Sequence, residues 1–204
     1  MRSLNSGHPR QSTDLSPGLL DRRSPGQAEY VLGMYSLLLV MVIALVSLQI
    51  MQYKADSDIA EDALAASCLA ALDVDPYRYG TDHRLVINDP VHARDIFDKA
   101  LRENMQLKDD HTPVTENDPY IYGKVSVDDF RVYVVDGDLV TEYRVSGGRV
   151  FEARAPFGEM KTPSGKTVSS AGTYAKISFD TRGFAGVRVP AVKEAYAEMV
   201  SGRN

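Results

Sequence analysis

The chain has 204 residues, and its 23 lysines and arginines stand against 28 aspartates and glutamates, which gives a formal net charge of −5. This acidic balance argues against a nucleic-acid-binding protein, which needs a basic footprint. The single cysteine, Cys68, excludes an internal disulfide framework. Its alanine-rich surroundings favour a small buried core residue over a reactive thiol.

Residues 1–26 are rich in Ser, Pro, Gly and Arg and have no hydrophobic periodicity. Such a composition cannot bury enough apolar surface to fold. We therefore expect a disordered cytoplasmic leader.

The next feature is an apolar run over residues 31–51 that contains no Asp, Glu, Lys, Arg or Pro. About 20 such residues in a helix span the roughly 30 Å of bilayer hydrocarbon. Basic residues flank the run on its N-terminal side, and acidic residues follow it. The sequence therefore predicts a transmembrane helix over residues 27–53 in the cytoplasmic membrane, with the N-terminus inside and the rest extracytoplasmic. A cleaved secretory signal is disfavoured, because its apolar region is about 7–15 residues long.

Residues 54–75 continue the helical signal as an amphipathic spine. They are rich in alanine and lack Gly and Pro, so one helix is expected to run from about residue 27 to 72. The predicted apolar face of the spine consists of Ile59, Ala63, Ala66 and Ala70. Pro76 and Gly80 are expected to end it.

Residues 76–204 are expected to form an extracytoplasmic α+β head. A short strand is predicted at residues 85–87, and Asp89 with Pro90 is typical of a helix N-terminus. The helix that follows should have about 16 residues. Its predicted apolar stripe consists of Ala93, Ile96, Phe97, Ala100, Leu101 and Met105. A polar loop is expected over residues 109–119.

From Tyr120 the hydrophobic period changes to two, which predicts antiparallel strands. Strands are expected at residues 130–135, 139–145, 150–153, 173–180 and 184–189, with hairpin turns at residues 136–138 and at Gly147 and Gly148. A Gly/Ser/Pro-rich excursion covers residues 156–172. The tail, residues 192–200, fits a helix or a strand, and the need for an edge partner favours a strand.

We nominate no catalytic, metal-binding or cofactor-binding residue. The histidines, His8, His83, His92 and His111, share no short spacing of the kind that metal sites need. The carboxylate pairs Asp73/Asp75, Asp128/Asp129 and Asp136/Asp138 could bind calcium, but turn chemistry and solvated element ends explain them better. The chain is therefore expected not to be an enzyme. An enzymatic alternative would involve Asp128, Asp129 or His111.

One acid, Glu29, stands just before the uncharged membrane helix. One expected role is an electrostatic interaction with the positive end of the helix dipole. The alternative is that this acid, close to the hydrocarbon, pairs with a group of another subunit during assembly. Small residues in the run allow helices to approach closely, or simply reflect ordinary membrane-helix composition. They are Gly33, Ser36, Ala44 and Ser47.

This arrangement resembles the type IV pilin superfamily: a basic leader ending in Gly26, then Gln27, a nearby Glu29-Tyr30 pair, an apolar helix that continues as a spine, and a small β-rich head. The Glu29-Tyr30 pair resembles that of Flp and TadE-like (tight adherence) pilins and pseudopilins. The stretch from Asp62 to Gly80 resembles TadE-like or pilus-assembly proteins of unassigned role from Gram-positive bacteria. The resemblance implies cleavage after the glycine and pairing of the new amine with a neighbour's glutamate. Here such a cleavage would make Glu29 the third mature residue, whereas the superfamily usually has it fifth.

The expected function is a non-catalytic pilin-like or pseudopilin-like subunit of a pilus or secretion assembly. Its partners would be the lipid bilayer, other pilin-like subunits and the assembly platform, with no nucleic acid and no cofactor. The alternative is a monomeric, single-pass, membrane-tethered binding or accessory module.

Overall fold

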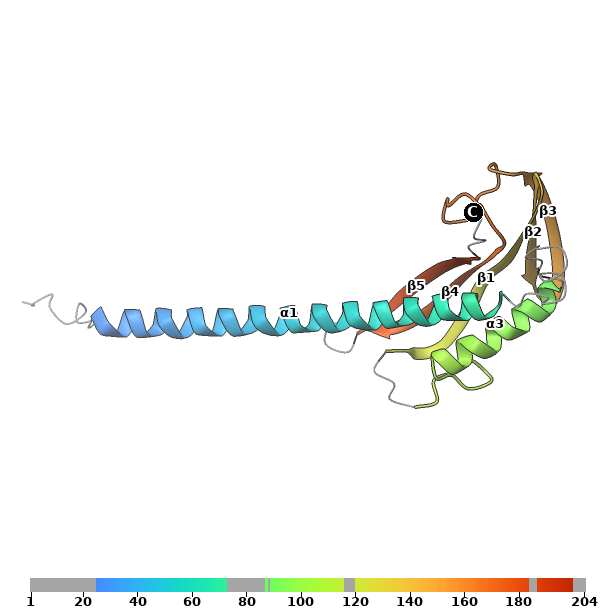
Figure 1. The fold of residues 1–204 in the computed structure, drawn as a ribbon. Coiled ribbons are helices and arrows are strands. Elements are labelled where there is room, and N and C mark those ends of the chain that lie inside the picture. Colours follow the sequence, from blue (N-terminus) through green and yellow to red (C-terminus); the bar gives the residue numbers. More distant parts are fainter. Residues whose placement is uncertain (1–24, 73–86, 88, 116–119, 184–186, 200–204) are drawn as a thin grey trace, which may run out of the picture. The chain divides into compact units, whose positions relative to one another are not determined.

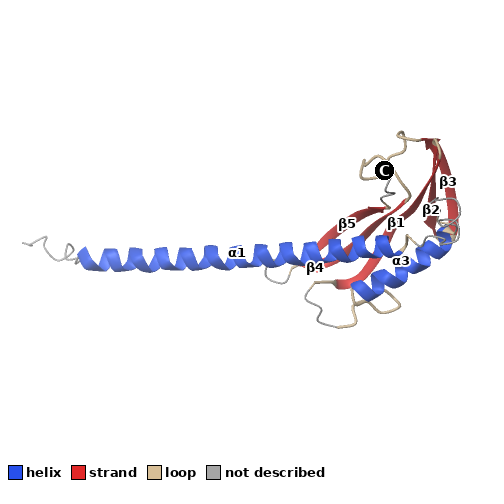
Figure 2. Cartoon of the chain, in the orientation of Figure 1, coloured by secondary structure: helices blue, strands red, loops and turns tan. Residues whose placement is uncertain are grey.

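The computed structural model describes residues 25–72, 87, 89–115, 120–183 and 187–199. The chain divides into two compact units, Met1–Leu48 and Gln49–Asn204, and the boundary falls inside the first helix. In the second unit, the end of that helix and a further helix pack on a five-stranded antiparallel sheet (Figure 1, Figure 2). The α+β architecture expected from the sequence is confirmed.

Several expectations fall outside the described residues. They concern residues 1–24 of the leader, the helix stop at Pro76 and Gly80, and most of the strand at residues 85–87. The described member of that strand, Ile87, is buried and has no strand conformation.

Helix α1 spans Pro25–Ala70. Proline suits its first turn, where a backbone N–H would have no partner. Past the apolar run the helix continues because residues 52–70 contain no Gly or Pro. The single long helix expected from about residue 27 to 72 is therefore confirmed, with each end about two residues early.

The predicted apolar face of the spine is wrong at three of its four residues, whereas Ala63 is partly buried and packs against the core. Ile59 is 50% exposed, and Ala66 and Ala70 are exposed as well. The buried stripe lies about one residue further along the helix and consists of Ala60, Leu64, Ser67, Cys68 and Ala71. This stripe places the bulkier Leu64 and the predicted core residue Cys68 against the sheet, and it leaves Ile59 outside.

Helix α3 spans Pro90–Asn104. The Asp89 carboxylate accepts hydrogen bonds from the backbone N–H groups of Val91 and His92 at 2.8 and 3.2 Å, so the predicted N-cap is confirmed. Much of the predicted stripe is buried, namely Ala93, Phe97, Leu101 and Met105, while Ile96 and Ala100 are partly buried.

The sheet has the order β3-β2-β1-β4-β5, and every neighbouring pair is antiparallel. The strands are β1 (Tyr122–Asp136), β2 (Leu139–Ser146), β3 (Arg149–Pro156), β4 (Gly172–Arg182) and β5 (Arg188–Glu198). The β2–β3 turn contains only Gly147 and Gly148, both at positive φ, as the two-residue hairpin requires. The predicted hairpins are confirmed.

The ambiguous tail is a strand, as favoured from the sequence. However, the separate strand expected over residues 184–189 is wrong at its C-terminal end, because β5 runs through Pro190 without interruption. Proline is tolerated there because β5 lies at an edge of the sheet, where a missing N–H need not break a ladder.

Both helices lie on one face of the sheet. Phe97 of α3 packs on Phe130 of β1 with ring centroids 4.9 Å apart. On the same face, the Thr173 hydroxyl of β4 donates a 2.6 Å hydrogen bond to the Cys68 carbonyl of α1. That carbonyl lies in the last turn of the helix, where it has no intrahelical partner.

The opposite face of the sheet carries a smaller core. Tyr133, Val140, Val168 and Tyr174 are buried there, with Met160 and Tyr196 packed against them. Val168 and Met160 belong to the segment between β3 and β4, which therefore covers this face. The Lys166 ammonium binds Glu198 at 2.8 Å and lies 4.9 Å from the centre of the Tyr196 ring, which ties the segment to β5.

Candidate functional site: the exposed apolar half of helix α1

The first half of α1 presents large apolar side chains with no protein packed against them. Tyr30 is 76% exposed and Leu38 is 56% exposed. The segment Ala28–Ala70 is long and apolar enough to cross a membrane, and none of its most apolar 18-residue window is buried. Each large side chain left in water forgoes about 1.5–3 kcal/mol of burial free energy. The segment therefore has the length and the exposed apolar surface of a membrane anchor or a signal sequence.

The predicted processing and assembly residues lie at the start of this helix. Gly26, Gln27, Glu29 and Tyr30 all have helical backbone, and Gly26, Glu29 and Tyr30 are exposed. The first turn of α1 contains no acidic residue, and Glu29 follows it. Because the helix dipole acts mainly within the first turn, the structure does not support the expected interaction of Glu29 with it. The exposure of Glu29 leaves the carboxylate accessible to a partner from outside the chain.

The predicted helix-packing residues share one face of α1. Gly33, Ser36, Ala44 and Ser47 are separated by three, eight and three positions, which on a helix of 3.6 residues per turn brings them within one narrow sector. A Cβ atom added at Gly33 would meet no atom within 4 Å. Another helix therefore has room to approach this sector.

The two serines in this sector keep their hydrogen bonds inside the helix. The Ser36 hydroxyl donates to the Gly33 carbonyl at 2.9 Å, and the Ser47 hydroxyl donates to the Ile43 carbonyl at 2.8 Å. Neither hydroxyl needs water to satisfy its donor. Such local bonding allows polar side chains to lie in hydrocarbon at low cost.

In the head, the residues of the enzymatic alternative each have a separate partner. Asp128 lies at a bulge in β1 and accepts a 3.0 Å hydrogen bond from the Ser178 hydroxyl. Asp129 is 2.7 Å from the Arg131 guanidinium, which also binds Glu142 at 3.1 Å. Partial burial of Arg131 disfavours its charge, but these two carboxylates outweigh that cost and raise its pKa. Asp129 is therefore held as an ion-pair partner.

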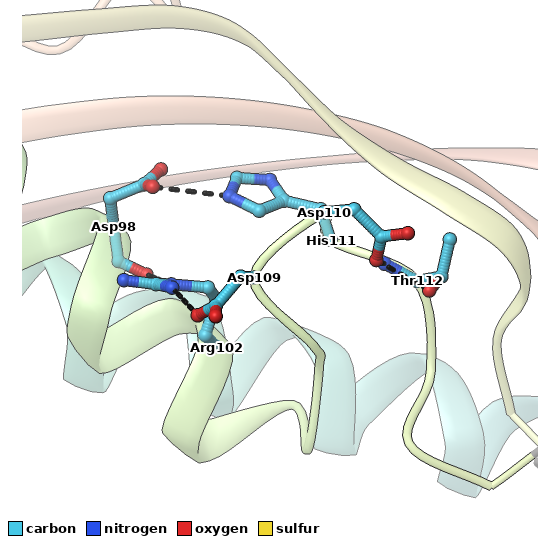
Figure 3. A network of polar contacts seen from close by, with 6 residues as sticks. All are labelled: Asp98, Arg102, Asp109, Asp110, His111 and Thr112. Atoms are coloured by element: carbon cyan, nitrogen blue, oxygen red, sulfur yellow. Dashed lines mark hydrogen bonds and ion pairs between the residues drawn. The ribbon is translucent and has the colours of Figure 1, made fainter.

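His111 belongs to another polar cluster, which Figure 3 shows at the junction of α3 and the loop after it. Its imidazole Nε2 is 3.1 Å from the Asp98 carboxylate. Arg102 pairs with Asp109, and the Thr112 hydroxyl donates to Asp110 at 2.6 Å. The His111 carbonyl accepts a hydrogen bond from the Val125 N–H of β1. The cluster fastens the loop between α3 and β1, which is a structural role.

Over the described ranges, no three His, Cys, Asp or Glu side chains are grouped so that they could hold a metal ion. His8, His83, Asp73 and Asp75 lie outside those ranges. Comparison of the chain with protein-family models, with curated proteins and with solved structures gives no match.

Sequence reasoning missed two features of the head. One is the Asp129–Arg131–Glu142 ion-pair network on the face of the sheet opposite the helices. The other is the contact between the buried Tyr133 and the partly buried Tyr196, whose rings meet edge to face at 5.9 Å. Because side chains alternate along a strand, the sequence of β1 places Asp129, Arg131 and Tyr133 on one face, and this pattern could have indicated a polar cluster there. Their partners come from other strands and could not be read from it.

Proposed function

We propose that this chain is a non-catalytic, pilin-like subunit that is anchored in the cytoplasmic membrane by residues 31–51. One observation carries the proposal: a single helix is apolar and exposed over its first half and forms part of the core of an α+β head over its second half. In the bilayer, lipid would cover the first half. On assembly, helices of other subunits would replace that lipid.

The charge distribution supports one orientation. Arg22 and Arg23 precede the apolar run, and Asp56 and Asp58 follow it closely. Basic flanks stay on the cytoplasmic side, so the head would be extracytoplasmic. The partners we propose are the lipid bilayer, other pilin-like subunits and an assembly platform.

The mass of the mature protein tests the pilin-like processing step. Loss of residues 1–26 would support a pilin. Retention of the leader would support the second candidate, a monomeric membrane-tethered module. A specific observation favours this second candidate: Gly26 and Gln27 lie within the first turn of α1, so the bond between them is not in an extended segment of the kind that proteases bind.

Glu29 provides a test of assembly that does not depend on cleavage. Glu29→Ala should leave membrane insertion intact and reduce the oligomers captured by chemical crosslinking in membranes. Asp58→Ala is the matched control, because it removes an exposed acid of the same helix beyond the apolar run. Equal crosslinking of Glu29→Ala and the unmodified protein would contradict the assembly role.

A further inference from the structure

Strand β3 is an edge strand with little protein around it. Among the described residues no strand pairs with its outer edge, since β3 ends the order β3-β2-β1-β4-β5. Seven of its eight residues are exposed, including Val150 and Phe151. An edge of this kind presents unpaired N–H and C=O groups and is a template for another strand.

The turn before β3 determines which residues direct their main chain outward. In a two-residue hairpin the residues that flank the turn form a hydrogen-bonded pair, here Ser146 and Arg149. Hydrogen-bonded pairs then alternate, so Phe151 and Ala153 direct their N–H and C=O groups to β2. Val150, Glu152 and Arg154 consequently direct theirs to the open edge.

The charges of β3 are complementary to a second copy of β3 in one register. Glu152 and Arg154 lie on the same face and pair with each other within one copy, and their side chains are 41% and 62% exposed, so both remain accessible to a second copy. If two β3 strands pair antiparallel about Ala153, each Glu152 lies opposite Arg154 of the other copy. A symmetric shift by one residue in either direction would instead place Glu152 opposite Glu152, or Arg154 opposite Arg154. Like charges in that position are destabilising.

We propose that β3 is a self-association edge, through which two copies of the chain join their sheets antiparallel about Ala153. In this register Glu152 and Arg154, whose main-chain groups are directed outward, form hydrogen-bonded pairs across the seam. The registers shifted by one residue also pair outward-directed residues, so charge is what selects the alignment about Ala153. The other edge strand, β5, is less suited, because Pro190 lacks an N–H donor. The pairing involves the head alone and does not depend on the pilin-like function.

Cysteine crosslinking of the full chain in detergent tests the register. Ala153 would face Ala153 of the second copy as a non-hydrogen-bonded pair, with Cα atoms about 4.5 Å apart, which is within disulfide range. Ala153→Cys should therefore form a disulfide-linked dimer under mild oxidation. In the control Ala155→Cys, the two cysteines would be offset by four residues, about 13 Å, and should not link. Equal crosslinking at both positions, or none at position 153, would overturn the proposal.

Charge reversal tests the specificity of the pairing. In the Ala153→Cys background, Glu152→Arg or Arg154→Glu alone places like charges opposite each other twice, and the dimer fraction should fall about tenfold. The double variant Glu152→Arg/Arg154→Glu should restore the dimer, because opposite charges meet again. Failure of the double variant to restore it would overturn the proposed register. Cys68 remains as an internal folding control, since it is fully buried in the native head.

Discussion

The two halves of helix α1 share one secondary structure but differ in the distribution of apolar side chains around the helix. Around Leu38 the helix is apolar on every side and exposed, whereas around Leu64 it is amphipathic and buries one stripe against the sheet. A helix that is apolar all round needs a solvent that is apolar all round, and one with a single apolar stripe needs one protein face. Substitution of a leucine should therefore have different consequences in the two halves, and matched variants can measure the difference.

The largest difference should come from truncating the two leucines. Leu64→Ala removes a fully buried side chain and should lower the free energy of unfolding of the head by about 2–5 kcal/mol. Leu38→Ala, the matched control, should leave this free energy unchanged, because Leu38 is exposed and belongs to the other compact unit. Denaturant unfolding of the full chain in detergent, followed by the tyrosine signal of the head, measures both. Equal destabilisation by the two variants would contradict the division.

A charged substitution should have its larger effect in the first half of α1, the opposite of the truncations to alanine. Leu38→Arg places a guanidinium near the middle of the apolar run and should cost about 2.5–3.5 kcal/mol of membrane insertion, with no loss of head stability. The fraction of protein that resists carbonate extraction from membranes measures insertion. Leu69→Arg is the control, since Leu69 is an exposed residue of the second half. If Leu38→Arg is retained in membranes as well as Leu69→Arg, lipid is not the solvent of this segment.

Local signals accounted for most of the fold. The Asp89 cap, the stripe of α3 and the glycine turn of the β2–β3 hairpin follow from residues near one another in the chain, and the structure confirms them. The face of the spine was placed one residue early, because an alanine-rich helix has little contrast between its sides. Which side is buried depends on Thr173 and the sheet, far away in sequence.

The face of the sheet opposite the helices shows a second limit of sequence reasoning. Tyr174 shares its face of β4 with the polar residues Lys176 and Ser178, so the pattern along the strand does not indicate that Tyr174 is buried. Its burial depends on Val168 and Met160, in the segment between β3 and β4. The candidate site in the first half of α1 could be predicted because it depends on composition alone.

The contact between α1 and β4 yields a smaller effect. Thr173→Val removes the hydroxyl that binds the Cys68 carbonyl and leaves that carbonyl buried without its partner, which should cost about 1–3 kcal/mol. Thr173→Ser keeps the hydroxyl and should retain most of the stability. The unfolding midpoints of the two variants measure the difference. A serine variant as unstable as the valine variant would assign the loss to packing.

Cys68 gives the most local measure of how the second half of α1 is packed. Burial raises the pKa of its thiol from 9.0 to about 12. The unfolded chain therefore loses this proton first, and the stability that the neutral thiol contributes is complete below pH 9 and is lost as the pH rises through 12.

At pH 8 the native thiol should resist a water-soluble thiol reagent, whereas Ala65→Cys, exposed on the same helix, should react at once. In the alkaline window the unfolding midpoint should fall less steeply for Cys68→Ala than for the unmodified protein. Parallel pH dependences, or rapid labelling of native Cys68, would mean that this face of the helix opens to water, and the contrast between the two halves of α1 would then be lost.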